Sequence, residues 1–272
     1  MNISNFPLLF SEDLISYLEG KLKNYASALK EGVIYAVSKG KRIRPLAVYL
    51  SAKTFGGEYQ DIRLLAFVIE LIHSYSLVHD DLPAMDNDDF RRGEPTVHKK
   101  FGHAQGILIG DLLLTLAGDI ALEYSALGAK HNKAVREIFI NAGKMVDGQF
   151  MEFSDSVFDK QALLNIYERK TTALIKASLL AGACALGCSD DDYESLSVFG
   201  QALGLLFQIS DDFFDLEEDI ARGVKTIPVL LGKEQALIFM EQLKNNALNV
   251  LKNIQNNDYL QAYFDLLINR KF

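Results

Sequence analysis

The chain has 272 residues, of which 49% are hydrophobic and 24% charged, a composition typical of a globular protein with a substantial core. Its formal net charge of −8 excludes non-specific nucleic-acid binding through a basic face, although local basic clusters or bound metal can still attract an anionic substrate. Polar residues interrupt every long apolar stretch before it reaches the roughly 18–20 residues of a membrane-spanning helix. Residues 1–10 lack the features of a secretion signal. We therefore expect a cytoplasmic protein without stable membrane insertion.

Apolar residues recur at helical spacing along most of the chain. This spacing predicts helices over residues 64–78, 107–124, 135–153, 160–180 and 196–214. Alternating strand patterns are scarce, and no low-complexity linker divides the sequence. We therefore predict an all-α helical bundle in which residues 1–272 form a single domain.

The first polar segment, residues 40–44, contains Lys41 and Arg44, which lie three positions apart and can face the same way on a helix. Taken alone, such charges are more often part of a solvated surface. Beside a metal–phosphate site they would suit phosphate binding, Arg by a bidentate contact and Lys as a point charge.

The first acidic segment follows the predicted helix 64–78 and contains Asp80, Asp81 and Asp86. On a regular helix Asp80 and Asp86 would lie about 240° apart. Pro83 disfavours a helical conformation at Leu82, so a distorted turn could bring both carboxylates to one point. Oxygen ligands suit Mg²⁺, which binds through one or two carboxylates plus substrate phosphates. The alternative is a solvated acidic loop.

Further charged residues support a phosphate site. Arg91 and Arg92 follow the first aspartates directly, so we expect their guanidinium groups near that metal site. Asp211 and Asp215 follow the predicted helix 196–214 and share a helix face, where like charges repel unless a cation lies between them. Residues 217–219 are better explained as solvated surface.

The two cysteines, Cys184 and Cys188, are too few for a disulfide framework. Their C-x3-C spacing within an Ala/Leu-rich stretch fits two small core residues on a helix better than a metal site.

Together these residues resemble the trans-prenyl diphosphate synthase family, in its bacterial farnesyl diphosphate synthase type, and the match runs essentially end to end. Residues 80–86 resemble the family's first aspartate-rich motif, DDx4D, and residues 211–215 the second, DDxxD. The segments GKRIRP, RRGEPT, GQ, KT and FQ, which begin at residues 40, 91, 148, 170 and 207, also match.

The resemblance implies an all-α fold around a central cavity, with the two aspartate motifs facing each other across its mouth. It implies three Mg²⁺ ions on the allylic diphosphate, ligated by Asp80, Asp86 and Asp211 and supported by Asp81 and Asp215. Arg91, Lys170 and Lys225 would contact the allylic diphosphate. Isopentenyl diphosphate would contact Lys41, Arg44, His73 and Arg92. Thr171 and Gln208 would flank the reacting carbons.

The implied reaction joins isopentenyl diphosphate head to tail with dimethylallyl or geranyl diphosphate to give farnesyl diphosphate. The resemblance also implies that the enzyme is a homodimer. Tyr75 lies five residues before Asp80, about 7 Å along a helix, where a large ring can close the cavity floor. In this family an aromatic residue there, with the two-residue insertion, resembles the farnesyl type, whereas longer-product relatives usually carry a smaller or non-aromatic residue. Ordinary core packing is the alternative for Tyr75, and geranylgeranyl diphosphate is the alternative product.

The sequence departs from the family after Asp215, where relatives usually carry a longer loop containing Gly and Lys. Residues 216–225 are short and acidic, and Lys225 directly precedes Thr226, so Arg222 could take over its role. Glu152 replaces the aspartate common after Gly-Gln.

Three other functions would each explain part of the sequence. A terpene cyclase would need an Asn/Ser/Glu metal motif, which the sequence lacks. A metal phosphohydrolase is suggested by His79-Asp80, but the other histidines lack convincing ligand spacing. An inactive regulatory subunit could lose its metal aspartates, whereas this chain keeps both triplets.

Overall fold

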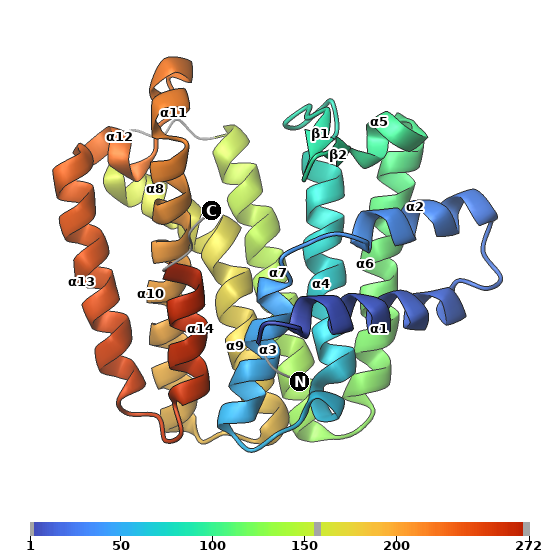
Figure 1. Cartoon of the computed structure of the whole chain (residues 1–272), viewed down its shortest axis with the longest axis horizontal. Helices are drawn as coiled ribbons and strands as arrows, with labels where there is room; N and C mark the ends of the chain where they lie inside the picture. Colours follow the sequence, from blue (N-terminus) through green and yellow to red (C-terminus); the bar gives the residue numbers. More distant parts are fainter. Residues whose placement is uncertain (1–2, 155–158, 269–272) are drawn as a thin grey trace. The chain divides into compact units, whose positions relative to one another are not determined.

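The computed structural model describes residues 3–154 and 159–268, and nearly all of its elements are helices (Figure 1). The prediction of an all-α fold is confirmed. The chain forms two compact units. The first comprises Met1–Leu46 and Arg63–Gly128, and the second comprises Ala47–Ile62 and Ala129–Phe272. That residues 1–272 act as a single domain stays a prediction.

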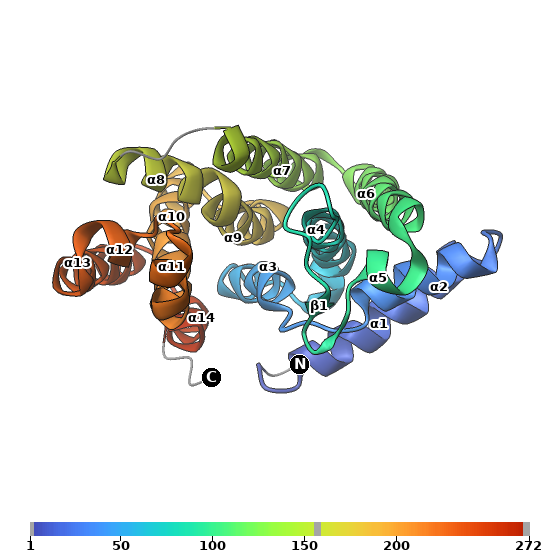
Figure 2. The same cartoon turned by 90° about the horizontal axis from the view of Figure 1, so that it is seen from above.

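The first unit is built on two long helices that lie side by side, α4 and α6, with α1 and α2 running across them (Figures 1 and 2). Its elements are α1 (Phe6–Lys21), α2 (Ser27–Val37), all but the first turn of α4 (Tyr59–Asp80), β1 (Phe90–Arg91), β2 (Glu94–Pro95), α5 (Val97–Phe101) and α6 (His103–Ser125). Gly32 lets α2 approach α6 closely, since a Cβ atom there would lie 2.2 Å from Cδ1 of Ile109.

Helix α4 is apolar on nearly all sides because it forms the core of the first unit. Phe67, Val68 and Ile69 are completely buried. By length and composition α4 and α6 could each cross a membrane, but 67% of the apolar window of α4 and 44% of that of α6 are buried within the protein. The buried core helix of a globular protein can have the same length and composition, so these two helices are weak evidence for a membrane span.

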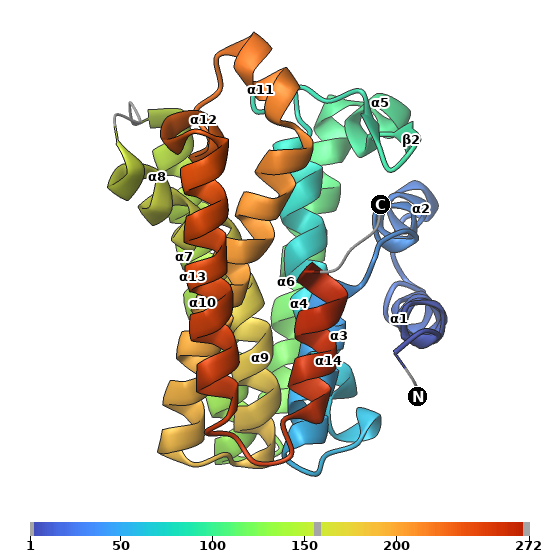
Figure 3. The same cartoon turned by 60° about the vertical axis from the view of Figure 1, so that its left-hand side comes forward.

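The second unit is a bundle in which α9 and α10 pack together, with α7 against α9 and with α13 and α14 against α10 (Figures 2 and 3). Its elements are most of α3 (Ile43–Thr54), α7 (Ala129–Ser154), α8 (Lys160–Tyr167), the π-helical turn η1 (Glu168–Thr172), α9 (Ala173–Leu186), α10 (Asp190–Phe214), α11 (Leu216–Arg222), α12 (Ile227–Leu231), α13 (Lys233–Leu251) and α14 (Asp258–Ile268).

Candidate active site

The first acidic segment is a tight turn that directly follows α4. Helix α4 ends at Asp80, and the backbone N–H of Asp86 donates a 2.9 Å hydrogen bond to the carbonyl of Asp80. Asn87 adopts a left-handed φ of 55°, and its N–H bonds the carbonyl of Leu82 at 3.1 Å. The distorted turn expected around Pro83 is therefore present, and it brings the backbones of Asp80 and Asp86 together.

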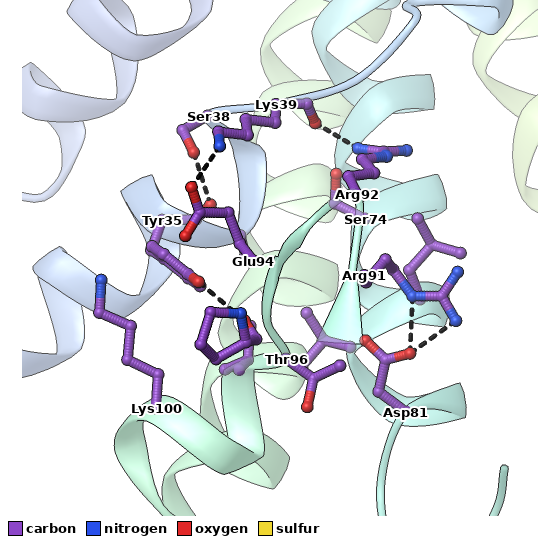
Figure 4. A pocket seen from close by; sticks show the side chains of 15 residues that line it. Tyr35, Ser38, Lys39, Ser74, Asp81, Arg91, Arg92, Glu94, Thr96 and Lys100 are labelled. Carbon is purple, nitrogen blue, oxygen red and sulfur yellow. Dashed lines mark hydrogen bonds and ion pairs between the residues drawn. The ribbon is translucent and has the colours of Figure 1, made fainter. Parts of the chain in front are cut away.

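A β-hairpin then returns the chain to Asp81. Arg91 pairs with Glu94, and the two residues between them, Arg92 and Gly93, have φ angles of 55° and 76°. Two positive φ angles are the mark of a type I′ hairpin turn, which matches the twist of the flanking strands. The hairpin directs Arg91 toward Asp81, and its Nε donates to Oδ1 of Asp81 at 2.6 Å (Figure 4).

Asp81 is buried, with only 3% of its surface exposed. Burial raises the pKa of this carboxyl group, and the hydrogen bond and charge of Arg91 work in the opposite direction. The expected proximity of Arg91 to the first aspartates is therefore present, and Asp81 itself faces a guanidinium group.

A cavity of about 260 Å³ lies beside the hairpin within the first unit (Figure 4). Its charged lining residues are Lys39, Asp81, Arg91, Arg92, Glu94 and Lys100. Arg92 Nη1 donates to the backbone carbonyl of Lys39, and the Lys39 ammonium group pairs with Glu94. With four cations against two carboxylates, the cavity suits an anionic ligand.

Arg42 has a structural function that its basic surroundings do not reveal. Its side chain is fully buried in an ion pair with Glu70, and it also donates to the carbonyl of Val37 and, at 2.9 Å, to Oγ of Ser11. Arg42 itself has a φ of 55°. Lys41, next to it, is exposed.

Arg44 and His73, both expected to bind isopentenyl diphosphate, lie together, with Nη1 of Arg44 3.1 Å from Nε2 of His73. Since the guanidinium group can only donate, Nε2 of His73 is the acceptor and the ring is neutral. Burial holds the pKa of His73 well below its usual value, and the charges of Arg44, Arg92 and Arg91 lower it further. Four of the predicted diphosphate-binding residues therefore converge in the first unit.

Tyr75 is buried, with 8% of its surface exposed, and its ring packs edge-on against His79 at a centroid distance of 5.9 Å. His79 turns toward α6, where its Nε2 lies 3.1 Å from the carbonyl of Ile107. A Cβ atom at Gly110 would lie 2.1 Å from the same nitrogen. This position gives His79 a packing role and does not favour the phosphohydrolase interpretation.

In the second unit, the predicted single helix over residues 160–180 is interrupted. Glu168–Thr172 form the π-helical turn η1, which carries Lys170 and Thr171. Two glycines, one on each neighbouring helix, leave the space that this turn occupies. A Cβ atom at Gly148 of α7 would lie 2.4 Å from the backbone nitrogen of Lys170, and one at Gly204 of α10 would lie 2.6 Å from Cγ2 of Thr172. Such π turns are frequent at functional sites.

A chain of hydrogen bonds links η1 to α10. Thr171 Oγ1 donates to Oε1 of Gln208 at 2.6 Å, and Nε2 of Gln208 donates to Oδ1 of Asp212 at 2.9 Å. The hydroxyl group of Tyr167 donates to Oδ2 of Asp212 at 2.6 Å. Thr171 and Gln208, both expected to flank the reacting carbons, are therefore in contact, and Asp212 fixes the orientation of the Gln208 amide.

Sequence reasoning overlooked Tyr167 and Asp212. Asp212 is 5% exposed, and burial raises its pKa to about 6, although the bonds from Tyr167 and Gln208 oppose that shift. Only a weak feature of the sequence marked each of these two residues. Asp212 lies one position from Asp211, and Tyr167 falls on the apolar face of its helix.

The remaining site residues of the second unit lie on η1, at the end of α10 and after it. The N–H of Asp215 bonds the carbonyl of Asp211 at 3.3 Å, so these residues are one turn apart as expected. Lys170 pairs with Glu152 of α7. Helix α11 buries no residue, and Arg222 pairs with Glu218 of the same helix at 3.1 Å. Lys225 is exposed between α11 and α12.

Comparison with known proteins identifies the family of the chain. The polyprenyl synthetase family model matches residues 26–225, a range that includes every predicted site residue. The chain belongs to the polyprenyl synthetase family. It is therefore a prenyltransferase, and its fold is that of the isoprenoid synthases.

Individual relatives agree with this family. The chain is 34% identical to the farnesyl diphosphate synthase of Micrococcus luteus, over 97% of this chain and 98% of that protein. It is 33% identical to geranylgeranyl pyrophosphate synthase 7 of Arabidopsis thaliana, over 86% and 77% of the two chains. An FPP/GFPP synthase structure from Zymomonas mobilis superposes with a TM-score of 0.88 at 32% identity, covering 98% of this chain and 99% of that one.

Polyprenyl synthetases are Mg²⁺ enzymes, so the donor set must fit that ion. In the described ranges, no three His, Cys, Asp or Glu side chains are arranged to hold a metal. Mg²⁺ does not need such a cluster, because it is commonly held by one or two carboxylates, several waters and the substrate phosphates. Asp80 and Asp86 at one motif, and Asp211 and Asp215 at the other, supply oxygen ligands only. The residues present therefore fit Mg²⁺.

Proposed function

We propose that this prenyltransferase condenses isopentenyl diphosphate head to tail with dimethylallyl or geranyl diphosphate to give farnesyl diphosphate. The convergence of Arg44, Arg91 and Arg92 around a neutral His73, next to the Asp80–Asp86 turn, is the observation that carries the proposal. Guanidinium groups bind diphosphate oxygens in bidentate fashion, and adjacent carboxylates can hold the accompanying cation.

Each basic group binds the diphosphate of one of the two substrates. Arg91, Lys170 and Lys225 hold the allylic diphosphate, and Lys41, Arg44, His73 and Arg92 hold isopentenyl diphosphate. When bound, Mg²⁺ at Asp80, Asp86, Asp211 and the supporting Asp81 and Asp215 neutralises charge on the leaving diphosphate. The allylic C–O bond breaks, a C–C bond forms to isopentenyl diphosphate, and a proton leaves to the departing diphosphate.

Neither a protein nucleophile nor a protein general base is required. Thr171 and Gln208 flank the reacting carbons, and their mutual hydrogen bond, fixed by Asp212, holds both polar groups in one orientation. A fixed dipole stabilises a developing cation without the cost of reorganisation. Apolar walls exclude water that would otherwise quench the cation.

Farnesyl diphosphate is proposed because Tyr75 is a buried aromatic residue five positions before Asp80. The relatives include farnesyl and geranylgeranyl diphosphate synthases at similar identity, so overall similarity alone does not choose between these products. Geranylgeranyl diphosphate is the second candidate.

We also propose that the enzyme is a cytoplasmic homodimer without stable membrane insertion. Helix α6 exposes apolar side chains along its length, with Leu108 59%, Leu114 38% and Leu122 74% exposed. Exposed apolar side chains on one helix support an interface with a second copy of the chain. Sedimentation of the purified protein tests the dimer.

Product chromatography tests the activity. Purified protein with Mg²⁺, geranyl diphosphate and isopentenyl diphosphate should give farnesyl diphosphate, and omission of isopentenyl diphosphate or addition of EDTA should abolish the product. Hydrocarbon formed from an allylic diphosphate alone would indicate a terpene cyclase. Absence of any C10–C20 product would contradict the assignment and favour the inactive subunit.

A further inference from the structure

The two cysteines of the chain lie at the C-terminal end of α9, and only one of them is on the helix. Helix α9 ends at Leu186, and Gly187 follows with a left-handed φ of 81°. The N–H of Cys188 bonds the carbonyl of Ala183 at 3.2 Å, and the N–H of Gly187 bonds that of Cys184 at 3.0 Å. These two bonds define a Schellman motif, which reverses the chain and folds Cys188 back over the last turn.

The reversal brings the two thiols into contact, so the interpretation as two core residues on one helix is wrong for Cys188. The two thiols lie close enough to share a hydrogen bond. Cys184 is 2% exposed, whereas Cys188 is half-buried. A dissolved oxidant can therefore reach Cys188 first, with Cys184 directly behind it.

The two sulfurs are also chemically different. The hydrogen bond shared with Cys184 lowers the pKa of Cys188, and the charge of Lys133 on α7 lowers it further, while burial and the carboxylates of Asp192 and Asp190 on α10 oppose the shift. The same hydrogen bond and burial raise the pKa of Cys184. An accessible thiol of lowered pKa beside a resolving thiol is the arrangement found in oxidation-sensitive sites.

We propose that Cys184 and Cys188 form a redox-active dithiol, in which Cys188 is the site of attack on an oxidant and Cys184 resolves the product to an intramolecular disulfide. With a hydroperoxide as oxidant, the Cys188 thiolate attacks the terminal oxygen and the O–O bond breaks, giving a sulfenic acid and an alcohol or water. The Cys184 thiol then loses its proton and attacks the sulfenic sulfur, which releases water. In sum, two thiols and one hydroperoxide give a disulfide, water and the reduced hydroperoxide.

The test uses the 272-residue chain, whose only thiols are these two. Native protein treated with stoichiometric hydrogen peroxide should fall from two titratable thiols to none, and dithiothreitol should restore both. Trypsin cuts after Lys176 and Arg222, so both cysteines remain in one peptide, residues 177–222. That peptide should become lighter by two hydrogen atoms, without added oxygen.

Two matched variants separate the roles. In Cys184→Ser, Cys188 lacks its partner and should go on to the sulfinic acid or form a stable mixed disulfide with oxidised glutathione. In Cys188→Ser, the buried Cys184 should stay reduced in the folded protein. Far-UV circular dichroism checks that each variant is folded. The proposal is overturned if native wild-type protein keeps both thiols under conditions that modify Cys188 of Cys184→Ser, or if wild-type Cys188 gains oxygen as fast as it does in that variant.

Discussion

The hydroxyl group of Tyr167 lies 2.6 Å from Oδ2 of Asp212, and both side chains are buried. The other carboxylate oxygen of Asp212, Oδ1, accepts a hydrogen bond from Nε2 of Gln208. The amide oxygen of Gln208 in turn accepts a hydrogen bond from Oγ1 of Thr171. Tyr167 therefore acts on the proposed reaction through two intermediate residues, as a positioning residue.

Replacing Tyr167 by Phe should remove this donor with little change in volume. Because a hydrogen bond to a charged group is worth about 2 kcal/mol, the free energy of unfolding should fall by roughly that amount. Loss of Gln208 orientation should lower kcat about tenfold and leave KM for both diphosphates nearly unchanged. Steady-state kinetics and urea denaturation measure the two effects.

Tyr193→Phe is the matched control, because it also removes a tyrosine–carboxylate bond, the 3.0 Å contact to Glu137. It should cost stability without changing kcat. Equal kinetic losses in the two variants would contradict a positioning role for Tyr167.

Gly148→Ala should displace the π-helical turn. The added Cβ atom would lie 2.4 Å from the backbone nitrogen of Lys170 and 2.7 Å from Cβ of Arg169, so the turn must shift. Overpacking of this kind costs about 1–3 kcal/mol. Misplacement of Lys170 and Thr171 by about 1 Å should lower kcat about 100-fold.

Gly143→Ala, on the same helix, meets no atom within 4 Å and should stabilise the protein by about 0.5–1 kcal/mol with full activity. If Gly148→Ala behaves like this control, the close approach of α7 to η1 is unimportant.

The long central helices α4, α6, α7 and α10 could be predicted from the sequence because burial of one face imposes the 3.6-residue period. Helices α1, α2, α3, α13 and α14 were not predicted. Helices α4, α6, α7 and α10 all begin four to six residues before their predicted starts. For α7 and α10 the physical reason can be read from their first turns. The first turn of α7 and the acidic first turn of α10 (Asp190–Asp192) lack a continuous apolar face. Ser189, whose Oγ accepts from the N–H of Asp192 at 3.1 Å, was a capping signal for α10 that periodicity alone does not use.

The π turn and the Tyr167–Asp212 bond could not be predicted in the same way. The turn depends on glycines in α7 and α10, and the bond joins residues 45 positions apart. Such tertiary contacts leave no local pattern. The aspartate motifs could be recognised, and the pairs Arg44/His73 and Thr171/Gln208 could each be assigned to one substrate region, because family resemblance carries long-range information. Roles for Lys225 and for the metal ligands stay predictions.

His73 should make stability depend on pH. Its folded-state pKa lies well below its unfolded value near 6.5, so between these values the unfolded chain binds a proton that the folded protein excludes. The free energy of unfolding should therefore fall as pH is lowered below about 6.5, by up to about 1.4 kcal/mol per pH unit. Denaturant titrations between pH 7.5 and 5 measure this slope.

His73→Gln keeps a hydrogen-bond acceptor for Arg44 and should reduce the slope. Part of it should remain, because burial also lowers the pKa of His98. An unchanged slope in the variant would show that His73 does not titrate as described.

Arg42→Met should leave Glu70 as a buried carboxylate without its cation. Removal of one partner of a buried ion pair typically costs about 3–5 kcal/mol. The double variant Arg42→Met/Glu70→Met should recover part of this loss, since no charge then remains buried. Lys39→Met, which breaks the exposed pair with Glu94, should have little effect. Chemical denaturation of the four proteins tests whether burial sets the difference.

Tyr75→Ala should lengthen the product. The ring is 8% exposed and lies about 7 Å before Asp80 along α4, so its removal opens space in the direction in which the chain is proposed to grow. We expect the ratio of C20 to C15 product to rise at least tenfold, whereas Tyr75→Phe keeps the ring and should keep the C15 product. The ratio of products is insensitive to the loss of stability that a cavity causes, because both products come from the folded enzyme. If Tyr75→Ala makes only C15 product, the ring is ordinary core packing and another residue limits the chain.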